Sequence, residues 1–114
     1  MALNIQGVDI SNNNPISNLS TLTENGVQYL YLKSTEGATF VDQTTPARYV
    51  QAKNLGLKVG FYHFLVGTSL PEAQAENAYN ATKTYAQDLA FMLDVEVNFD
   101  SLCDYRSEER RVGK

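Results

Sequence analysis

The sequence of 114 residues contains one cysteine, Cys103, and one histidine, His63. A single cysteine excludes an internal disulfide framework and any zinc site built from several cysteines. A lone histidine is too little for a zinc site or for a Ser-His catalytic triad. We therefore expect no metal ion and no other cofactor.

Long apolar runs and an excess of basic residues are also absent. No segment approaches the run of about 20 apolar residues that a membrane span needs. The formal net charge is −4, and no basic patch builds up, so we expect neither nucleic acid nor a membrane surface as a partner. The opening residues, MALNIQGVD, lack a basic segment followed by an apolar stretch, so no secretory signal is visible. We expect a monomer.

Short apolar runs alternate with amphipathic segments along the first 99 residues. The runs predict strands over residues 4–10, 27–33, 58–64 and 89–95. A capping box at 21–24 predicts a helix that ends at Gly26, and another at 69–72 predicts a helix to about Tyr85. Between them, Thr45 and Pro46 predict a helix start, with Gly56 as its terminator.

This order of elements predicts an α/β fold with right-handed crossovers and a parallel sheet. Two architectures remain open, a small doubly wound sheet and part of a (β/α)8 barrel. A whole barrel needs about 250 residues, so four strands alternating with three helices would form only its first half. We interpret residues 1–99 as one truncated domain.

The pattern breaks at Asp100. The segment DYRSEERRVGK is densely charged and has no apolar period. We interpret residues 100–114 as a polar tail that is not native to the domain and resembles vector or adapter read-through. A frayed polar C-terminus is the alternative.

Two carboxylates interrupt the apolar run FMLDVEVNF, at Asp94 and Glu96. Ionised side chains on a buried strand are costly unless they are paired, hydrogen-bonded or functional. Side chains two residues apart on a strand point to the same side, so both carboxylates face one space. A structural pair of carboxylates that caps neighbouring loops is the alternative.

Other polar residues gather at the predicted carboxyl ends of the strands, where parallel α/β folds place their active sites. Asp9 ends the first strand, Glu36 follows the second, and the third ends with Tyr62 and His63. Tyr62 and His63 point to opposite faces. We expect Tyr62 to face the substrate and His63 to be structural, although the reverse assignment stays open. Together these residues predict a carboxylate-based active site.

Four segments carry a family resemblance: GVDIS, KSTEG, GLKVGFYHF and LDVEV. They resemble the family 25 glycoside hydrolases, the N-acetylmuramidase-type lysozymes of bacteria and bacteriophages, over about residues 5–98. The resemblance implies the N-terminal portion of an irregular (β/α)-barrel. It also implies hydrolysis of the β-1,4 bond between N-acetylmuramic acid and N-acetylglucosamine in a peptidoglycan glycan strand. Action at the cell wall would then require export by another route or release at phage lysis.

The resemblance further implies that Glu96 is the general acid and that Asp9 and Asp94 are supporting carboxylates. Glycoside cleavage needs one protonated and one charged carboxyl group. Our hypothesis is that Asp94 orients the 2-acetamido group of the substrate and that Asp9 lines the −1 subsite. Glu36 is either a substrate contact or a solvated loop acid. We expect the fragment to be weak or inactive alone, and a non-catalytic peptidoglycan-binding module is the competing function.

Overall fold

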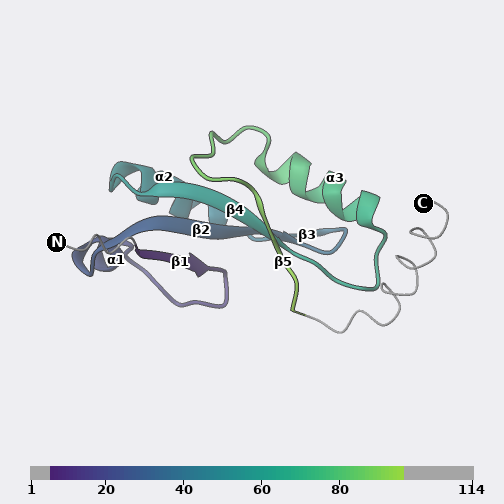
Figure 1. Cartoon of the computed structure of the whole chain (residues 1–114), viewed down its shortest axis with the longest axis horizontal. Coiled ribbons are helices and arrows are strands. Elements are labelled where there is room, and N and C mark those ends of the chain that lie inside the picture. Colours follow the sequence, from purple (N-terminus) through teal and green to yellow (C-terminus); the bar gives the residue numbers. More distant parts are fainter. Residues whose placement is uncertain (1–5, 97–114) are drawn as a thin grey trace.

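The computed structural model describes residues 6–96 and contains one curved sheet (Figure 1). Four parallel strands follow the order β1-β2-β4-β5, and a short β3 pairs antiparallel with the end of β2. The strands are β1 (Gln6–Ile10), β2 (Val27–Glu36), β3 (Phe40–Val41), β4 (Lys58–Phe64) and β5 (Met92–Asp94).

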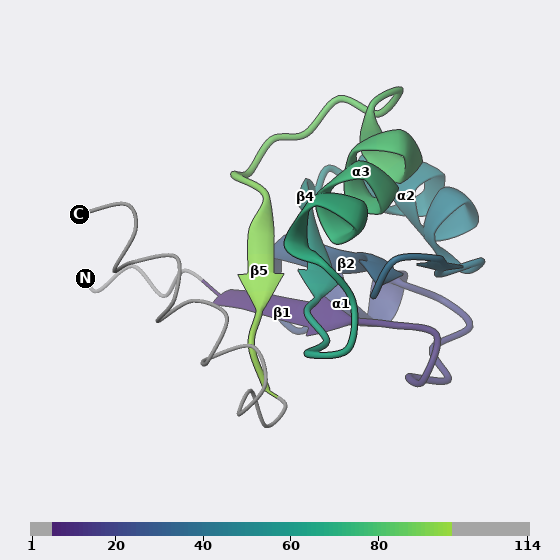
Figure 2. The ribbon, with the colours of Figure 1, turned by 90° about the vertical axis from the view of Figure 1, so that its right-hand side faces the viewer.

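Three helices lie in the connections: α1 (Ser20–Glu24), α2 (Thr45–Asn54) and α3 (Pro71–Thr82). Figure 2 shows α2 and α3 on the same side of the sheet. Leu19 and Leu22, at α1, pack into the core beneath α2. A doubly wound sheet carries helices on both faces, so this one-sided covering favours the barrel. No helix among residues 6–96 is long and apolar enough to cross a membrane.

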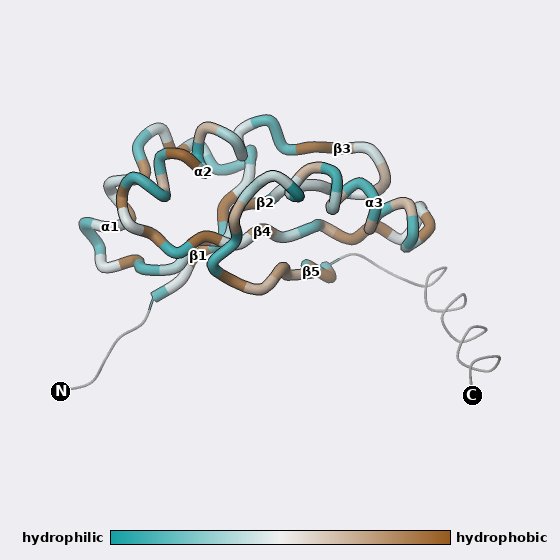
Figure 3. The backbone as a smooth tube through the Cα atoms, turned by 90° about the horizontal axis from the view of Figure 1, so that it is seen from above, coloured by the Kyte–Doolittle hydropathy of each residue, from teal (hydrophilic) through white to brown (hydrophobic). Residues whose placement is uncertain are grey.

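The hydrophobic core lies between the sheet and the helices. Leu30 and Leu32 of β2 and Val59 and Phe61 of β4 are each at most 1% exposed, and Ala52 of α2 is fully buried above them. An aromatic cluster extends this core, because the ring of Tyr49 stacks on Phe61 with a centroid separation of 5.8 Å. In Figure 3 hydrophobic stretches of the tube occur in α2 and in the strands that it covers, and also in β3 and β5.

The predicted parallel sheet is confirmed, but the ends of its strands differ from the prediction. β2 runs three residues past Lys33, to Glu36, because its end pairs with both β3 and β4. β5 covers only Met92–Asp94. The antiparallel β3 was not predicted, because a strand of two residues leaves no periodicity to detect.

The predicted N-terminal helix caps are wrong, whereas the predicted terminators Gly26 and Gly56 are confirmed, because they follow the C-caps of α1 and α2 with φ angles of 86° and 82°. No helix among residues 6–96 has a side-chain hydrogen bond at its N-cap, and the N-cap residues are Leu19, Thr44 and Leu70. Thr45 lies inside α2 and donates its hydroxyl to the carbonyl of Lys33 at 2.5 Å. Tertiary contact with the sheet therefore replaced local capping at this helix. α3 ends at Thr82, three residues before the predicted end at Tyr85.

Candidate active site on the inner face of the sheet

The strand registers place the predicted site residues on two different faces. Asp9 lies beside Tyr31, Lys33 beside Tyr62, and Phe64 beside Asp94. Side chains in register on neighbouring parallel strands point to the same face. The face opposite the helices, which we call the inner face, therefore carries Asp9, Lys33, Tyr62 and Asp94.

Two of the three predicted catalytic carboxylates, Asp9 and Asp94, lie near Tyr62, and the third, Glu96, contacts Asp94. Asp9 and Glu96 are exposed, and Asp94 is half-buried. Burial raises the pKa of the Tyr62 phenol to about 12, and the negative charges of Asp9 and Asp94 add to the shift. Tyr62 therefore stays protonated and can donate a hydrogen bond on the acidic inner face.

The pKa of Glu96 is raised by the neighbouring carboxyl groups. A hydrogen bond to the Asp94 carboxyl group and the negative charge of Asp94 raise the pKa of Glu96, and the charge of Asp9 adds to the effect. The ammonium group of Lys33 acts in the opposite direction. Two neighbouring carboxylates that share a proton can divide the roles of acid and anion between them.

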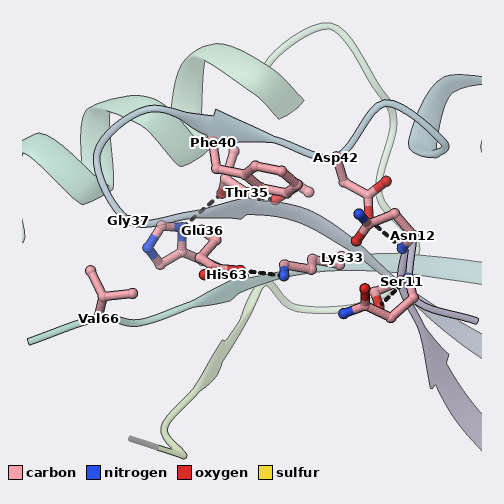
Figure 4. A network of polar contacts seen from close by, with 12 residues as sticks. Ser11, Asn12, Lys33, Thr35, Glu36, Gly37, Phe40, Asp42, His63 and Val66 are labelled. Carbon is pink, nitrogen blue, oxygen red and sulfur yellow. Dashed lines mark hydrogen bonds and ion pairs between the residues drawn. The ribbon is translucent and has the colours of Figure 1, made fainter.

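Lys33 is a functional candidate that the sequence analysis did not select. Its side chain is buried, and its Nζ atom lies 2.5 Å from Oε1 of Glu36 (Figure 4). The same Nζ atom lies 5.2 Å from the ring centroids of both Phe40 and Phe64. Like Asp94, Lys33 is a charge within an apolar strand run, and this feature marks it in the sequence.

A cleft of about 440 Å³ opens beside this ion pair. It lies between the turn after β1, the β2–β3 hairpin and the loop after β4. Its walls mix amides, hydroxyls and the partly exposed ring of Phe40, a combination that suits a polar ligand with apolar faces. The lining residues are Asn12, Asn13, Lys33, Glu36, Gly37, Ala38, Thr39, Phe40, Val66, Thr68 and Ser69.

Asp42 holds one wall of this cleft in place. Its side chain is 1% exposed and accepts hydrogen bonds from the backbone N–H groups of Asn12 and Thr44 at 2.8 and 2.9 Å. Arg48 supports the same turn by donating to the carbonyls of Ser11 and Asn14 at 2.7 and 2.6 Å. The turn after β1 is thereby fixed against the start of α2.

His63 lies away from the carboxylates, buried beneath α3. Gln74 donates from Nε2 to the carbonyls of Val66 and Ser69, and its Oε1 accepts the N–H of Val66. That Oε1 atom can therefore only accept from His63 Nε2, at 2.8 Å. The Nδ1 atom of His63 then accepts from the Thr35 hydroxyl at 2.7 Å (Figure 4). This placement favours the structural alternative for His63.

The structure thus places Asp9 and Asp94 near Tyr62, joins Glu96 to Asp94, and pairs Glu36 with Lys33. Within residues 6–96, no group of three or more histidine, cysteine, aspartate or glutamate side chains is placed to hold a metal ion. The predicted tail from Asp100, with Cys103, lies outside the described residues.

The chain is similar in sequence to glycosyl hydrolases of family 25 and to two lysozymes. The sequence profile of glycosyl hydrolases family 25 matches residues 8–113. The autolytic lysozyme of Clostridium acetobutylicum is 36% identical over 107 residues, which cover 94% of this chain and 33% of that protein. Lysozyme M1 of Streptomyces globisporus is 33% identical over 98 residues, which cover 82% of this chain and 33% of that protein.

A solved family 25 glycosyl hydrolase from Bacillus anthracis superposes with a TM-score of 0.77 at 29% identity. The match covers 89% of this chain and 46% of the Bacillus anthracis chain. This chain therefore spans about a third of the curated relatives and about half of the solved structure. The expected half of an irregular (β/α)-barrel is confirmed.

Proposed function

The chain belongs to family 25 of the glycosyl hydrolases, and on this basis we propose that its domain is a muramidase. Its substrate would be the peptidoglycan glycan strand, cleaved at the β-1,4 bond between N-acetylmuramic acid and N-acetylglucosamine. The observation that carries the proposal is the placement of Asp9 and Asp94 near Tyr62 on parallel strands, with Glu96 in contact with Asp94. Such a substrate places the action at the cell wall.

Glu96 is the general acid in this proposal. It gives its proton to the glycosidic oxygen as the bond from that oxygen to the anomeric carbon breaks. The raised pKa of Glu96 supports the role, because the acid must hold a proton at a higher pH than an ordinary glutamate does. The resulting carboxylate then takes a proton from the water that attacks the anomeric carbon.

Asp94 and Asp9 supply negative charge. Asp94 holds the 2-acetamido group of the sugar so that its carbonyl oxygen can assist at the anomeric carbon. Asp9 lines the −1 subsite and stabilises the positive charge that develops in the transition state. Tyr62, which keeps its proton, and Glu36, at the mouth of the 440 Å³ cleft, bind the sugar hydroxyl and amide groups.

Replacing the acid tests this assignment in a completed barrel. Residues 6–96 are joined in frame to the second half of the Bacillus anthracis hydrolase, and release of muramic acid reducing ends from purified cell walls is measured. Glu96→Gln should lower the rate by about 10²–10⁴-fold, the usual contribution of a general acid, while peptidoglycan binding persists. Glu72→Gln, an exposed acid of α3, is the matched control and should leave the rate unchanged.

Full activity in Glu96→Gln would refute the role of Glu96 as the acid. Binding of peptidoglycan by the unsubstituted fusion without any release of reducing ends would instead support the competing function, a glycan-binding module.

A further inference from the structure

The β2–β3 hairpin forms one wall of the 440 Å³ cleft, which residues 37–40 line in succession. β3 has two residues, and so short a ladder holds a hairpin weakly by itself. The position of this wall matters to the site, because the ring centroid of Phe40 lies 5.2 Å from Nζ of Lys33 (Figure 4). That Nζ atom is the one that pairs with Glu36.

Asn77 of α3 binds the hairpin on both sides of its turn. Its Nδ2 atom donates to the carbonyl of Gly37 and to the carbonyl of Phe40, each at 3.1 Å. A side-chain amide has two N–H donors, and Asn77 directs both of them to the hairpin. A single side chain therefore fixes how far apart the two ends of the turn lie.

The opposite wall of the cleft is held from the same helix. Gln74 donates from Nε2 to the carbonyls of Val66 and Ser69 at 2.8 and 3.0 Å, and both residues line the cleft. Residues three apart on a helix are neighbours on its surface, so α3 presents two amides that each hold one wall. Gln74 is buried and Asn77 is half-buried.

The two walls meet at Gly37. Its N–H group donates to the carbonyl of Phe64 at 3.2 Å, and a Cβ atom at this position would lie 3.3 Å from Cγ2 of Val66. The Gly37 end of the turn is therefore attached to β4 independently of Asn77. The Phe40 end carries the ring that contacts Lys33, and Asn77 ties this end to α3.

We propose that Asn77 is a positioning residue for glycan binding, because it holds the hairpin so that the Phe40 ring stays against Lys33 and the cleft keeps its width. The ligand in this inference rests on the proposed muramidase function. Asn77 acts through the hairpin and not on the proposed acid, since Glu96 follows β5 on the inner face. Loss of its hydrogen bonds should therefore weaken binding of the glycan and leave bond cleavage unaffected.

Asn77→Asp tests the position of the hairpin with a side chain of the same shape. The carboxylate has no N–H donor and repels the two carbonyl oxygens. In the chain of 114 residues, NMR measures the chemical shift of the ε-methylene protons of Lys33, which nearby aromatic rings move upfield. We expect Asn77→Asp to reduce this upfield shift as the Phe40 ring moves away. Asn80→Asp, the same substitution at an exposed position further along α3, is the matched control and should leave the shift unchanged.

Kinetics in the fusion with the second half of the Bacillus anthracis hydrolase test the consequence for binding. Asn77→Asp should raise KM for solubilised peptidoglycan by about tenfold, a usual cost of losing two hydrogen bonds. It should change kcat by less than about twofold, the pattern expected when an interaction contributes equally to the ground state and the transition state. Asn80→Asp should match the unsubstituted fusion in both constants.

An unchanged Lys33 shift in Asn77→Asp, or an equal change in Asn77→Asp and Asn80→Asp, would overturn the proposal. An unchanged KM would overturn it as well, and so would a collapse of the whole NMR spectrum, which would show that Asn77 serves folding in general. An unsubstituted fusion that releases no reducing ends would instead refute the proposed function. The Lys33 shift needs no glycan, so the two failures are distinguishable.

Discussion

At the scale of single residues, the inner face carries a small set of titratable groups that influence one another. Four elements contribute to it: Asp9 from β1, Lys33 from β2, Tyr62 from β4, and Asp94 at the end of β5. Glu96 follows β5 and responds to three of these groups, since Asp94 and Asp9 raise its pKa and Lys33 lowers it. The protonation of the proposed acid is therefore set by residues far apart in the sequence.

We predict that substitutions of its neighbours shift the pKa of Glu96 in opposite directions. Asp94→Asn should lower the pKa of Glu96, because the substitution removes the negative charge of Asp94 and replaces its carboxyl group, which forms a hydrogen bond with Glu96, by a neutral amide. Lys33→Met should raise it, because a nearby positive charge is lost. Carboxyl ¹³C NMR titration of Glu96 in the isolated chain measures both shifts.

Lys53→Met is the control for the removal of a lysine charge, because Lys53 pairs with Asp88 at 2.6 Å and does not contribute to the pKa of Glu96. Shifts of the same sign in Asp94→Asn and Lys33→Met would contradict the prediction. Folding raises the pKa of Glu96, so its stabilising contribution is full below the ordinary glutamate pKa and is lost as the pH rises through the folded value.

The sequence predicted part of this site. Asp9, Asp94 and Glu96 could be found because a buried strand makes a charge conspicuous and because strand ends meet at one edge of a parallel sheet. The role of Asp42 could not be predicted, because it depends on tertiary structure that brings the backbone N–H groups of Asn12 and Thr44 to its carboxylate. The role of Glu36 depends on Lys33, which reaches it from three residues away.

At the scale of elements, periodicity predicted the order of strands and helices, and tertiary contacts decided their ends. The run Lys58–Phe64 is a strand as predicted, because both of its edges pair with neighbours. The glycine signals for the ends of α1 and α2 held, but the N-cap signals failed, because the hydroxyls of Thr21 and Thr45 donate to the carbonyls of Asn18 and Lys33 instead. Local patterns therefore give the type of an element more reliably than its boundary.

Gly60 shows how closely neighbouring strands and loops approach on the inner face. A Cβ atom at this position would lie 2.7 Å from Cε1 of Tyr31 and 2.8 Å from Cβ of Leu89. Tyr31 has little room to move, because its hydroxyl donates to the carbonyl of Ala90 at 2.8 Å. Glycine therefore allows the segment before β5 to pack across β4.

We predict that Gly60→Ala lowers the free energy of unfolding by about 1–3 kcal/mol, the usual cost of overpacking. Urea denaturation followed by circular dichroism measures the change. Gly7→Ala is the matched control, because its nearest neighbour would be Cβ of Tyr29 at an ordinary 3.4 Å. We expect this control to change stability by less than about 0.5 kcal/mol. Equal stabilities of Gly60→Ala and the unsubstituted chain would contradict the packing argument.

At the scale of the whole molecule, the described residues build one wall of a barrel. The core beneath α2 is complete, whereas Leu93 and Val95 on the β5 side are more than half exposed. Asp9 and Glu96 are exposed on the inner face. Water around a carboxylate weakens its interaction with developing charge, so the proposed catalytic groups work best when the opposite wall excludes solvent.

We therefore predict that the isolated chain of 114 residues is marginally stable and releases few or no reducing ends from purified cell walls. Its free energy of unfolding should lie below the range of about 5–15 kcal/mol that is typical of native domains. Its hydrolytic rate should be at least about 100-fold lower than that of the fusion with the second half of the Bacillus anthracis hydrolase, because electrostatic stabilisation of the transition state needs a water-excluded site. Both proteins are assayed at equal molar concentration, with the Glu96→Gln fusion as the blank. Lysis by the isolated chain at a rate close to that of the fusion would show that one wall of the barrel suffices for catalysis.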